Sequence, residues 1–171
     1  MRQITIKAGN YFLNGMSGRY RRTLDNTEIR LNREYVSGVQ IDGRWVPGYH
    51  HGEISMSLFG NKIAWRKHRN DLENPEDLNI YWTMAGFDTV TTRERLSGIG
   101  VNLVRKRGKT FWHKPGGEIV EVNPNVVYNI HYLQAVKPLM ASGNMYIAQH
   151  RLDKMVPNRQ RFNPALLCTA N

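Results

Sequence analysis

The stretch EISMSLFGNKIAWRK, residues 53–67, contains the clearest β-hairpin pattern in the chain. Apolar and polar residues alternate through Glu53–Phe59 and again through Lys62–Lys67, and this alternation is typical of half-buried strands. Gly60-Asn61 suits a tight turn with glycine at its first central position. The residues expected on the shared apolar face are Ile54, Met56, Leu58, Ile63 and Trp65. The stretch therefore predicts two antiparallel strands that cover part of a core.

Two further hairpins are predicted, one on each side of this stretch. In residues 39–46, Asp42-Gly43 tolerates the positive φ angles of a type I′ turn and lies between two short β-type segments. In residues 101–113, Lys106-Arg107-Gly108 is expected to form a three-residue loop with its glycine in the left-handed conformation. The chain is therefore expected to be rich in antiparallel hairpins.

Two segments carry helix signals. Thr91 to Glu94 matches a capping box and predicts a short helix that ends at Gly98. A longer helix is predicted from Pro124 to Val136, with Asn123 as its N-cap and Pro138 as the residue that prevents its continuation.

Together these signals predict an α+β fold. Single strands are expected at residues 4–7, 28–35, 80–84 and 145–148, and a loop or short helix at 69–79. The predicted architecture is a mostly antiparallel sheet of β-hairpins packed by one long and one short helix, within one domain spanning residues 1–150. Residues 151–171 are predicted to be a basic C-terminal tail with partial order.

The charge balance limits the kinds of partner. The 171 residues include 24 Lys and Arg against 14 Asp and Glu, a formal net charge of +10 at pH 7. Such a field attracts polyanions, so DNA, RNA, an anionic membrane surface or an acidic protein could each be the partner. No run of about 18 apolar residues occurs. The only cysteine, Cys168, allows no intrachain disulfide, which favours a soluble protein of the cytoplasm.

Basic residues cluster at several places, most clearly at the tip of the 101–113 hairpin. Arg and Lys there are expected to contact phosphates, and Trp112 is expected either to stack on a base or to support the ribbon. The candidate nucleic-acid-binding residues are Arg105, Lys106, Arg107, Lys109, Trp112, Lys114, Arg66, Lys67, Arg69, Arg19, Arg21, Arg22, Arg93 and Arg95.

These cations also have structural interpretations. Arg and Lys on exposed hairpin edges prevent strand-to-strand aggregation. Arg93 and Arg95 lie on the predicted short helix, whose N-terminus could hold an anion or could simply be capped by Glu94.

The sequence contains no recognisable catalytic motif, and no metal or other cofactor is expected. His51 and Glu53 share a strand face and could serve a small metal-dependent nuclease, but no third ligand occurs at useful spacing. The leading hypothesis is a nucleic-acid-binding protein without catalytic activity. Its alternatives are a protein that binds and inhibits an acidic host protein, and the nuclease.

The segment from Gly52 to Trp112 resembles a group of small uncharacterised bacteriophage proteins. The resemblance rests on Leu58 to Ala64 and on Ala85 to Leu96, which contains a Gly-aromatic-x-Thr-x-Thr-Thr-Arg-x-Arg-Leu motif. Ser97 stands where the group usually has Asn. The resemblance implies a phage origin and action in the cytoplasm of a bacterial host, through nucleic acid or host proteins, and it implies no particular activity.

Overall fold

The computed structural model describes residues 2–15, 21–24, 26–41, 43–46, 49–67 and 75–145. The fold class is α+β, as predicted. The described residues form helices and sheets, and every strand pairing among them is antiparallel. The elements are α1 (Gln3–Asn14), β1 (Arg21–Leu24), β2 (Thr27–Val36), β3 (Val39–Ile41), β4 (Arg44–Val46), β5 (Tyr49–Leu58), β6 (Asn61–Lys67), a 3₁₀ turn (Pro75–Leu78), β7 (Asn79–Trp82), α2 (Val90–Ser97), β8 (Leu103–Lys106), β9 (Lys109–His113), β10 (Ile119–Glu121), β11 (Tyr128–His131) and α3 (Tyr132–Ala141).

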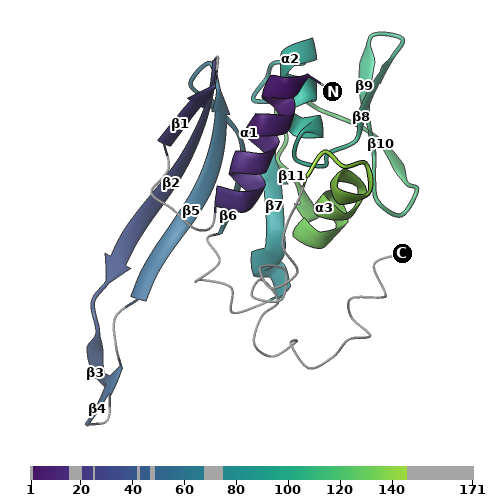
Figure 1. Ribbon diagram of the computed structural model, residues 1–171. Helices are drawn as coiled ribbons and strands as arrows, with labels where there is room; N and C mark the ends of the chain where they lie inside the picture. The colour runs from purple at the N-terminus through teal and green to yellow at the C-terminus, as the bar shows by residue number, and fades with distance from the viewer. Residues whose placement is uncertain are drawn as a thin grey trace.

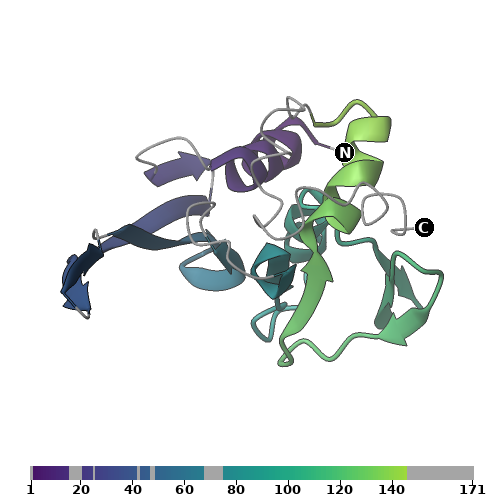
Figure 2. The same ribbon diagram turned by 90° about the horizontal axis from the view of Figure 1, so that it is seen from below.

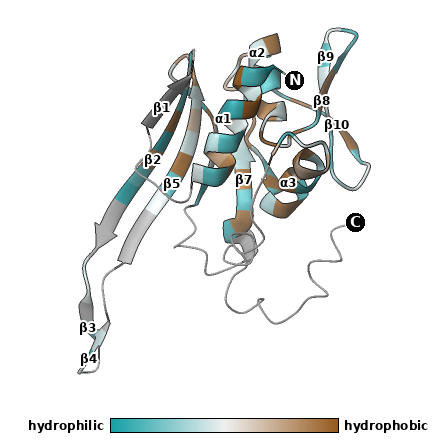
Figure 3. Ribbon diagram, in the orientation of Figure 1, coloured by the Kyte–Doolittle hydropathy of each residue, from teal (hydrophilic) through white to brown (hydrophobic). Residues whose placement is uncertain are grey.

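The main sheet has the strand order β1-β2-β5-β6-β7-β11, and a smaller sheet has the order β10-β9-β8. The helix α1 packs against β1, β2 and β5, while α2 packs against β6 and α3 against β11 (Figure 1). Hydrophobic and hydrophilic segments alternate along α1 and α3 in Figure 3, as expected for helices with one face on a core.

A long β-arm, residues 27–58, extends from the main sheet. The pairing of β2 with β5 runs from Thr27↔Leu58 to Val36↔Tyr49, and β3 pairs with β4 in the same register from Val39↔Val46. The predicted hairpin at 39–46 is therefore confirmed, and Gly43 has a φ of 76° there. Figures 1 and 2 show the arm projecting on one side of the molecule and the β8–β10 sheet lying on the opposite side.

The prediction of a strand at residues 4–7 is wrong, because this segment belongs to α1. Its buried residues are Thr5, Ala8, Gly9, Phe12 and Leu13, which follow the spacing of one helical face. Two alternating isoleucines were too short a pattern to distinguish a strand from a helix.

The prediction of a helix over 124–136 is wrong for residues 124–131 and confirmed only for residues 132–136, which belong to α3. Residues 128–131 form β11, which pairs with β7 so that Ile130 lies opposite Ile80, and both are buried. The helix α3 begins only at Tyr132 and contains Pro138, which deprives the Gln134 carbonyl of its usual helical partner. Sheet pairing and core packing here override the helical spacing of the apolar residues.

Two predicted hairpins are confirmed, but their turns lie elsewhere than predicted. Leu58 pairs with Asn61 and Lys106 with Lys109, so each turn has only two central residues. These are Phe59-Gly60, with φ of 50° and 80°, and Arg107-Gly108, with φ of 51° and 81°. Both have the positive φ values of type I′ turns.

A β-bulge in β6 changes which residues face the core. Met56 pairs with Ala64 but Ser57 pairs with Lys62, so Ile63 is the additional residue. Beyond the bulge, Arg66 rather than Trp65 lies opposite Ile54 on the buried face. The prediction for Trp65 is therefore wrong: its ring stacks on Tyr81 at 6.0 Å.

The helices α1 and α2 meet at a contact that only glycine permits. A Cβ atom added to Gly9 would lie 1.9 Å from the carbonyl oxygen of Gly98, which ends α2. Side chains at either position would force the two backbones apart. The contact fixes where α1 crosses the end of α2.

We expect Gly9→Ala to destabilise the protein by about 1–3 kcal/mol or more, since overpacking a close contact has that cost. Alanine raises helix propensity by about 0.5–1 kcal/mol, so without the clash the substitution would stabilise the protein. Urea denaturation gives the free energy of unfolding. The control is Gly116→Ala, because a Cβ there has no neighbour within 4 Å. Equal stability of the two variants would contradict the close contact.

Candidate nucleic-acid interface

The β8–β9 hairpin carries the densest basic cluster in the described chain. Arg105, Lys106, Arg107 and Lys109 are all exposed around its turn, as the sequence predicted. The left-handed conformation of Arg107 and Gly108 closes the turn tightly and brings Lys106 opposite Lys109. The four cations therefore share the end of one narrow ribbon, which we call the basic tip.

Carboxylates neutralise the basic tip only in part. Lys109 Nζ lies 2.9 Å from Glu121 of the neighbouring β10, with 61% and 52% of the two side chains exposed. Lys106 and Arg107 have no ion pair with any residue of the described chain. Lys114, farther along, lies 2.7 Å from Glu118 and is partly buried. The outermost cations of the tip thus remain available to an anion.

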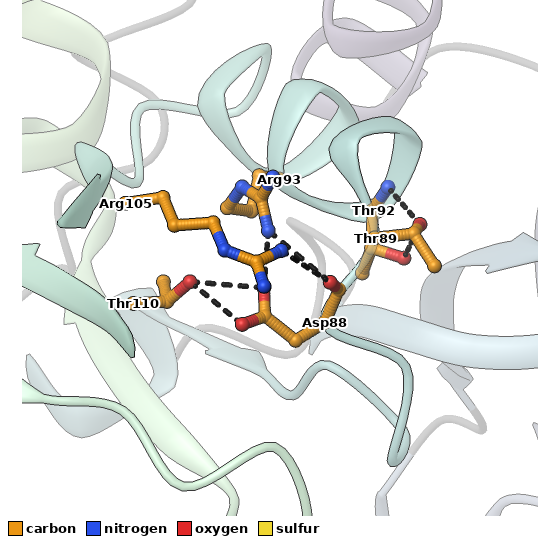
Figure 4. A network of polar contacts seen from close by, with 6 residues as sticks. All are labelled: Asp88, Thr89, Thr92, Arg93, Arg105 and Thr110. Atoms are coloured by element: carbon orange, nitrogen blue, oxygen red, sulfur yellow. Dashed lines mark hydrogen bonds and ion pairs between the residues drawn. The ribbon is translucent and has the colours of Figure 1, made fainter. Parts of the chain in front are cut away.

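Asp88 anchors the hairpin to the body (Figure 4). Both its carboxylate oxygens accept from the Thr110 hydroxyl of β9 at 2.9 Å, and its carboxylate pairs with Arg93 of α2. Arg105 of β8 donates to the Asp88 backbone carbonyl at 3.4 Å. A single residue therefore joins β8, β9 and α2, and it neutralises the charge of Arg93.

The start of α2 differs from the prediction. The N-cap is Thr89, whose hydroxyl oxygen accepts from the backbone N–H of Thr92 at 3.1 Å, so the predicted capping box at Thr91 is wrong. Glu94 instead pairs with Arg2 at 3.3 Å. The end of α2 at Gly98 is confirmed. The carboxylate of Asp88, just before this N-cap, already provides a negative charge near the helix N-terminus.

Two of the candidate cations are buried structural residues. Arg66 Nη2 donates to the carbonyls of Phe12 and Leu13, at 3.0 and 2.9 Å, at the C-terminal end of α1. Burial lowers the pKa of Arg66. Arg95 donates to the hydroxyls of Thr27 and Thr5 at 2.8 and 2.7 Å. The prediction that Arg66 and Arg95 bind nucleic acid does not fit this burial.

Trp112 is also buried, and it supports the hairpin from below. Its ring packs edge-on against Trp82 at 5.2 Å and contacts Tyr128 at 6.0 Å. Because Trp82 and Trp112 are both buried in the core, the indole of Trp112 has no open face for a base. Of its two predicted roles, the geometry fits the structural one.

The remaining candidates are scattered. Lys67 lies 2.6 Å from Asp77. Arg21 and Arg22 belong to β1, which pairs with β2, and their side chains lie outside the described part of the chain. Arg19 and Arg69 lie outside the described residues altogether, as does the tail from 151 to 171.

The described residues contain no cluster of three or more His, Cys, Asp or Glu side chains that could hold a metal ion. Glu53, half of the predicted nuclease pair, bonds to Lys62 Nζ at 2.8 Å.

Desolvation lowers the pKa of His131, which lies at the end of β11 rather than on the predicted helix.

Comparisons add no relatives: no family model, curated protein or solved structure matches the chain. Within the described residues, every helix is too short or too polar to cross a membrane.

Two features of this region were missed from sequence. Asp88 was not recognised as an anchor, although its position just before Thr89 and Thr92 is typical of a helix start. Phe59 and Phe87 were not recognised as surface residues, because phenylalanine is ordinarily buried.

We expect Asp88→Ala to lower the free energy of unfolding by about 1–3 kcal/mol, because it removes the carboxylate to which the largely buried Arg93 and Thr110 bond. Urea denaturation measures the loss, and amide exchange in β8 and β9 should accelerate. The control is Glu118→Ala, whose exposed pair should contribute about 0–1 kcal/mol. Indistinguishable stabilities would remove Asp88 as the anchor.

Proposed function

We propose that the protein binds nucleic acid, without catalysing a reaction on it, through the basic tip of the β8–β9 hairpin. The observation that carries the proposal is the exposure of Lys106 and Arg107 with no carboxylate partner among the described residues. Phosphate contacts of this kind supply most of the affinity for either DNA or RNA.

The weak internal pairing of the tip supports this proposal. Ion pairs between exposed side chains contribute about 0–1 kcal/mol, so Lys109 can exchange Glu121 for a phosphate at little cost. Arg105 is held against the Asp88 carbonyl and presents its remaining guanidinium donors beside the ribbon. Three to four phosphates are therefore within the capacity of one hairpin end.

The setting we propose is the cytoplasm of a phage-infected bacterium, in keeping with the motif at residues 85–96. The same cations also fit an acidic host protein. Direct titration with purified oligonucleotides distinguishes the two. A protein that docks only on acidic proteins should bind oligonucleotides no more tightly than its net charge alone would cause. Retention of a bacterial partner after nuclease treatment would favour the host protein.

The test is a double variant, Lys106→Gln with Arg107→Asn, in which asparagine tolerates the left-handed conformation of that turn residue. We expect weaker binding to single- and double-stranded probes. The slope of log K against log salt should decrease in magnitude by about 1.4–1.8, since each phosphate contact contributes about 0.7–0.9. Fluorescence anisotropy at several salt concentrations measures both quantities.

The matched control is Lys7→Gln with Lys137→Gln, which removes the same number of charges from exposed positions on α1 and α3. It should leave most of the affinity and the slope intact. An equal loss in both double variants would show that net charge, and not the basic tip, attracts the probe.

A further inference from the structure

Phe59 occupies a position that the fold alone does not explain. It is the first central residue of the β5–β6 turn, has a φ of 50° and is 65% exposed. A bulky side chain with positive φ is uncommon and costs free energy, and asparagine or glycine is the ordinary choice in a type I′ turn. Strained residues of this kind concentrate at functional sites.

A second exposed aromatic lies near the first. Phe87 is 53% exposed and follows a turn in which Ala85 and Gly86 also have positive φ values, of 50° and 81°. Both phenylalanines line one apolar pocket of about 260 Å³. Its floor consists of Leu58, Ile63 and Met84, which are nearly completely buried. Within the described chain, neither phenylalanine stacks on another aromatic ring.

The pocket adjoins the basic tip through one residue. Phe87 and Thr89 line its rim, and Asp88 between them bonds to Thr110 of β9 and, through its carbonyl, to Arg105 of β8. Asp88 therefore holds the ribbon one residue pair from its turn, and its two neighbours in the chain line the apolar pocket. A ligand in the pocket would have its neighbouring groups within reach of positive charge.

We propose that this pocket holds one unpaired base of a single-stranded nucleic acid, between Phe59 and Phe87, while adjacent phosphates contact the basic tip. This inference rests on the proposed function and specifies its ligand. Sequence-tolerant stacking on aromatic side chains beside a cationic track is the usual way in which proteins hold single strands.

The size and chemistry of the pocket favour a base over other occupants. Its volume lies just below the roughly 300–1,000 Å³ of pockets for drug-sized ligands, so it suits one planar ring system. Thr89 at the rim is engaged in capping α2, and the Asn61 amide donates to the Phe59 carbonyl at 3.3 Å, so the pocket offers apolar contact to the faces of a base rather than hydrogen bonds to its edge. An apolar side chain of an acidic protein partner would also fit the floor, and the probes below distinguish that occupant from a base.

The experiment compares two probes of equal charge, an oligothymidylate strand and an abasic strand of the same length. Wild-type protein should bind the base-containing strand more tightly. The double variant Phe59→Asn with Phe87→Ser should lose about 5- to 150-fold of this affinity, the loss of one stacked base, and should bind both probes alike. Asparagine relieves the strain at the turn, so thermal unfolding should show an unchanged or higher Tm for Phe59→Asn alone.

The control is Trp45→Ser, which removes an aromatic that is 69% exposed at the end of the β-arm and should retain the preference for bases. Wild-type binding that ignores the bases, but is lost in the basic-tip variant, would overturn this inference and leave the proposed function standing. The same holds if the phenylalanine variant keeps both its affinity and its preference for the base-containing strand. Failure of wild type to bind either probe would overturn both.

Discussion

The buried guanidinium of Arg66 is the interaction on which the arrangement of the layers depends. A charge in the core costs several kcal/mol unless hydrogen bonds compensate for it. The carbonyls at the end of α1, which carry the negative end of the helix dipole, provide this compensation. Tyr132 of α3 donates to the Leu13 carbonyl at 3.0 Å, and burial raises the pKa of Tyr132 to about 12, which keeps this donor protonated. The end of α1, the sheet and the start of α3 are therefore fixed around one side chain, and the bulge in β6 is what turns that side chain inward.

Buried arginines of this kind explain why the number of Lys and Arg residues overstates the positive charge that is exposed on the surface. Arg66 and Arg95 are used to join helices to the sheet, and Arg93 is neutralised by Asp88. At the basic tip, Lys106 and Arg107 are consecutive cations that are both exposed and without carboxylates among the described residues. Other exposed cations of the described chain without a carboxylate partner, Lys7, Arg44 and Lys137, lie on three separate elements. The excess of positive charge seen in the sequence is thus partly structural, and the part that can act on a partner is smaller and more localised than the composition indicates.

The sequence predicts the hairpins of this fold better than its helices. Glycine and the alternation of apolar residues located the strands around residues 43, 60 and 108, since both signals are local. The turns were misplaced because Phe59 and Arg107 occupy left-handed positions that neither residue type favours. The helix predicted over 124–136 begins only at Tyr132, because Tyr128–His131 pairs with β7 as β11 and buries Ile130 there. Likewise, the basic tip was predictable because its cations are close together in the sequence. The burial of Arg66 depends on the bulge at Ile63, which the local sequence does not predict.

The basic tip and the pocket between Phe59 and Phe87 differ in the same way, because the first depends on local sequence and the second on tertiary structure. Cations at a hairpin end need only exposure, but a base held between two phenylalanines also needs a fixed spacing from the phosphates. Asp88 provides that spacing, because its carboxylate bonds to Thr110 and Arg93 while its carbonyl accepts from Arg105. A ligand that meets an already ordered surface loses less free energy to side-chain ordering than one that must order it. If the protein binds a single strand as we propose, the anchor has a consequence beyond stability: by holding the ribbon next to Phe87, it would let one strand occupy the pocket and the basic tip at the same time.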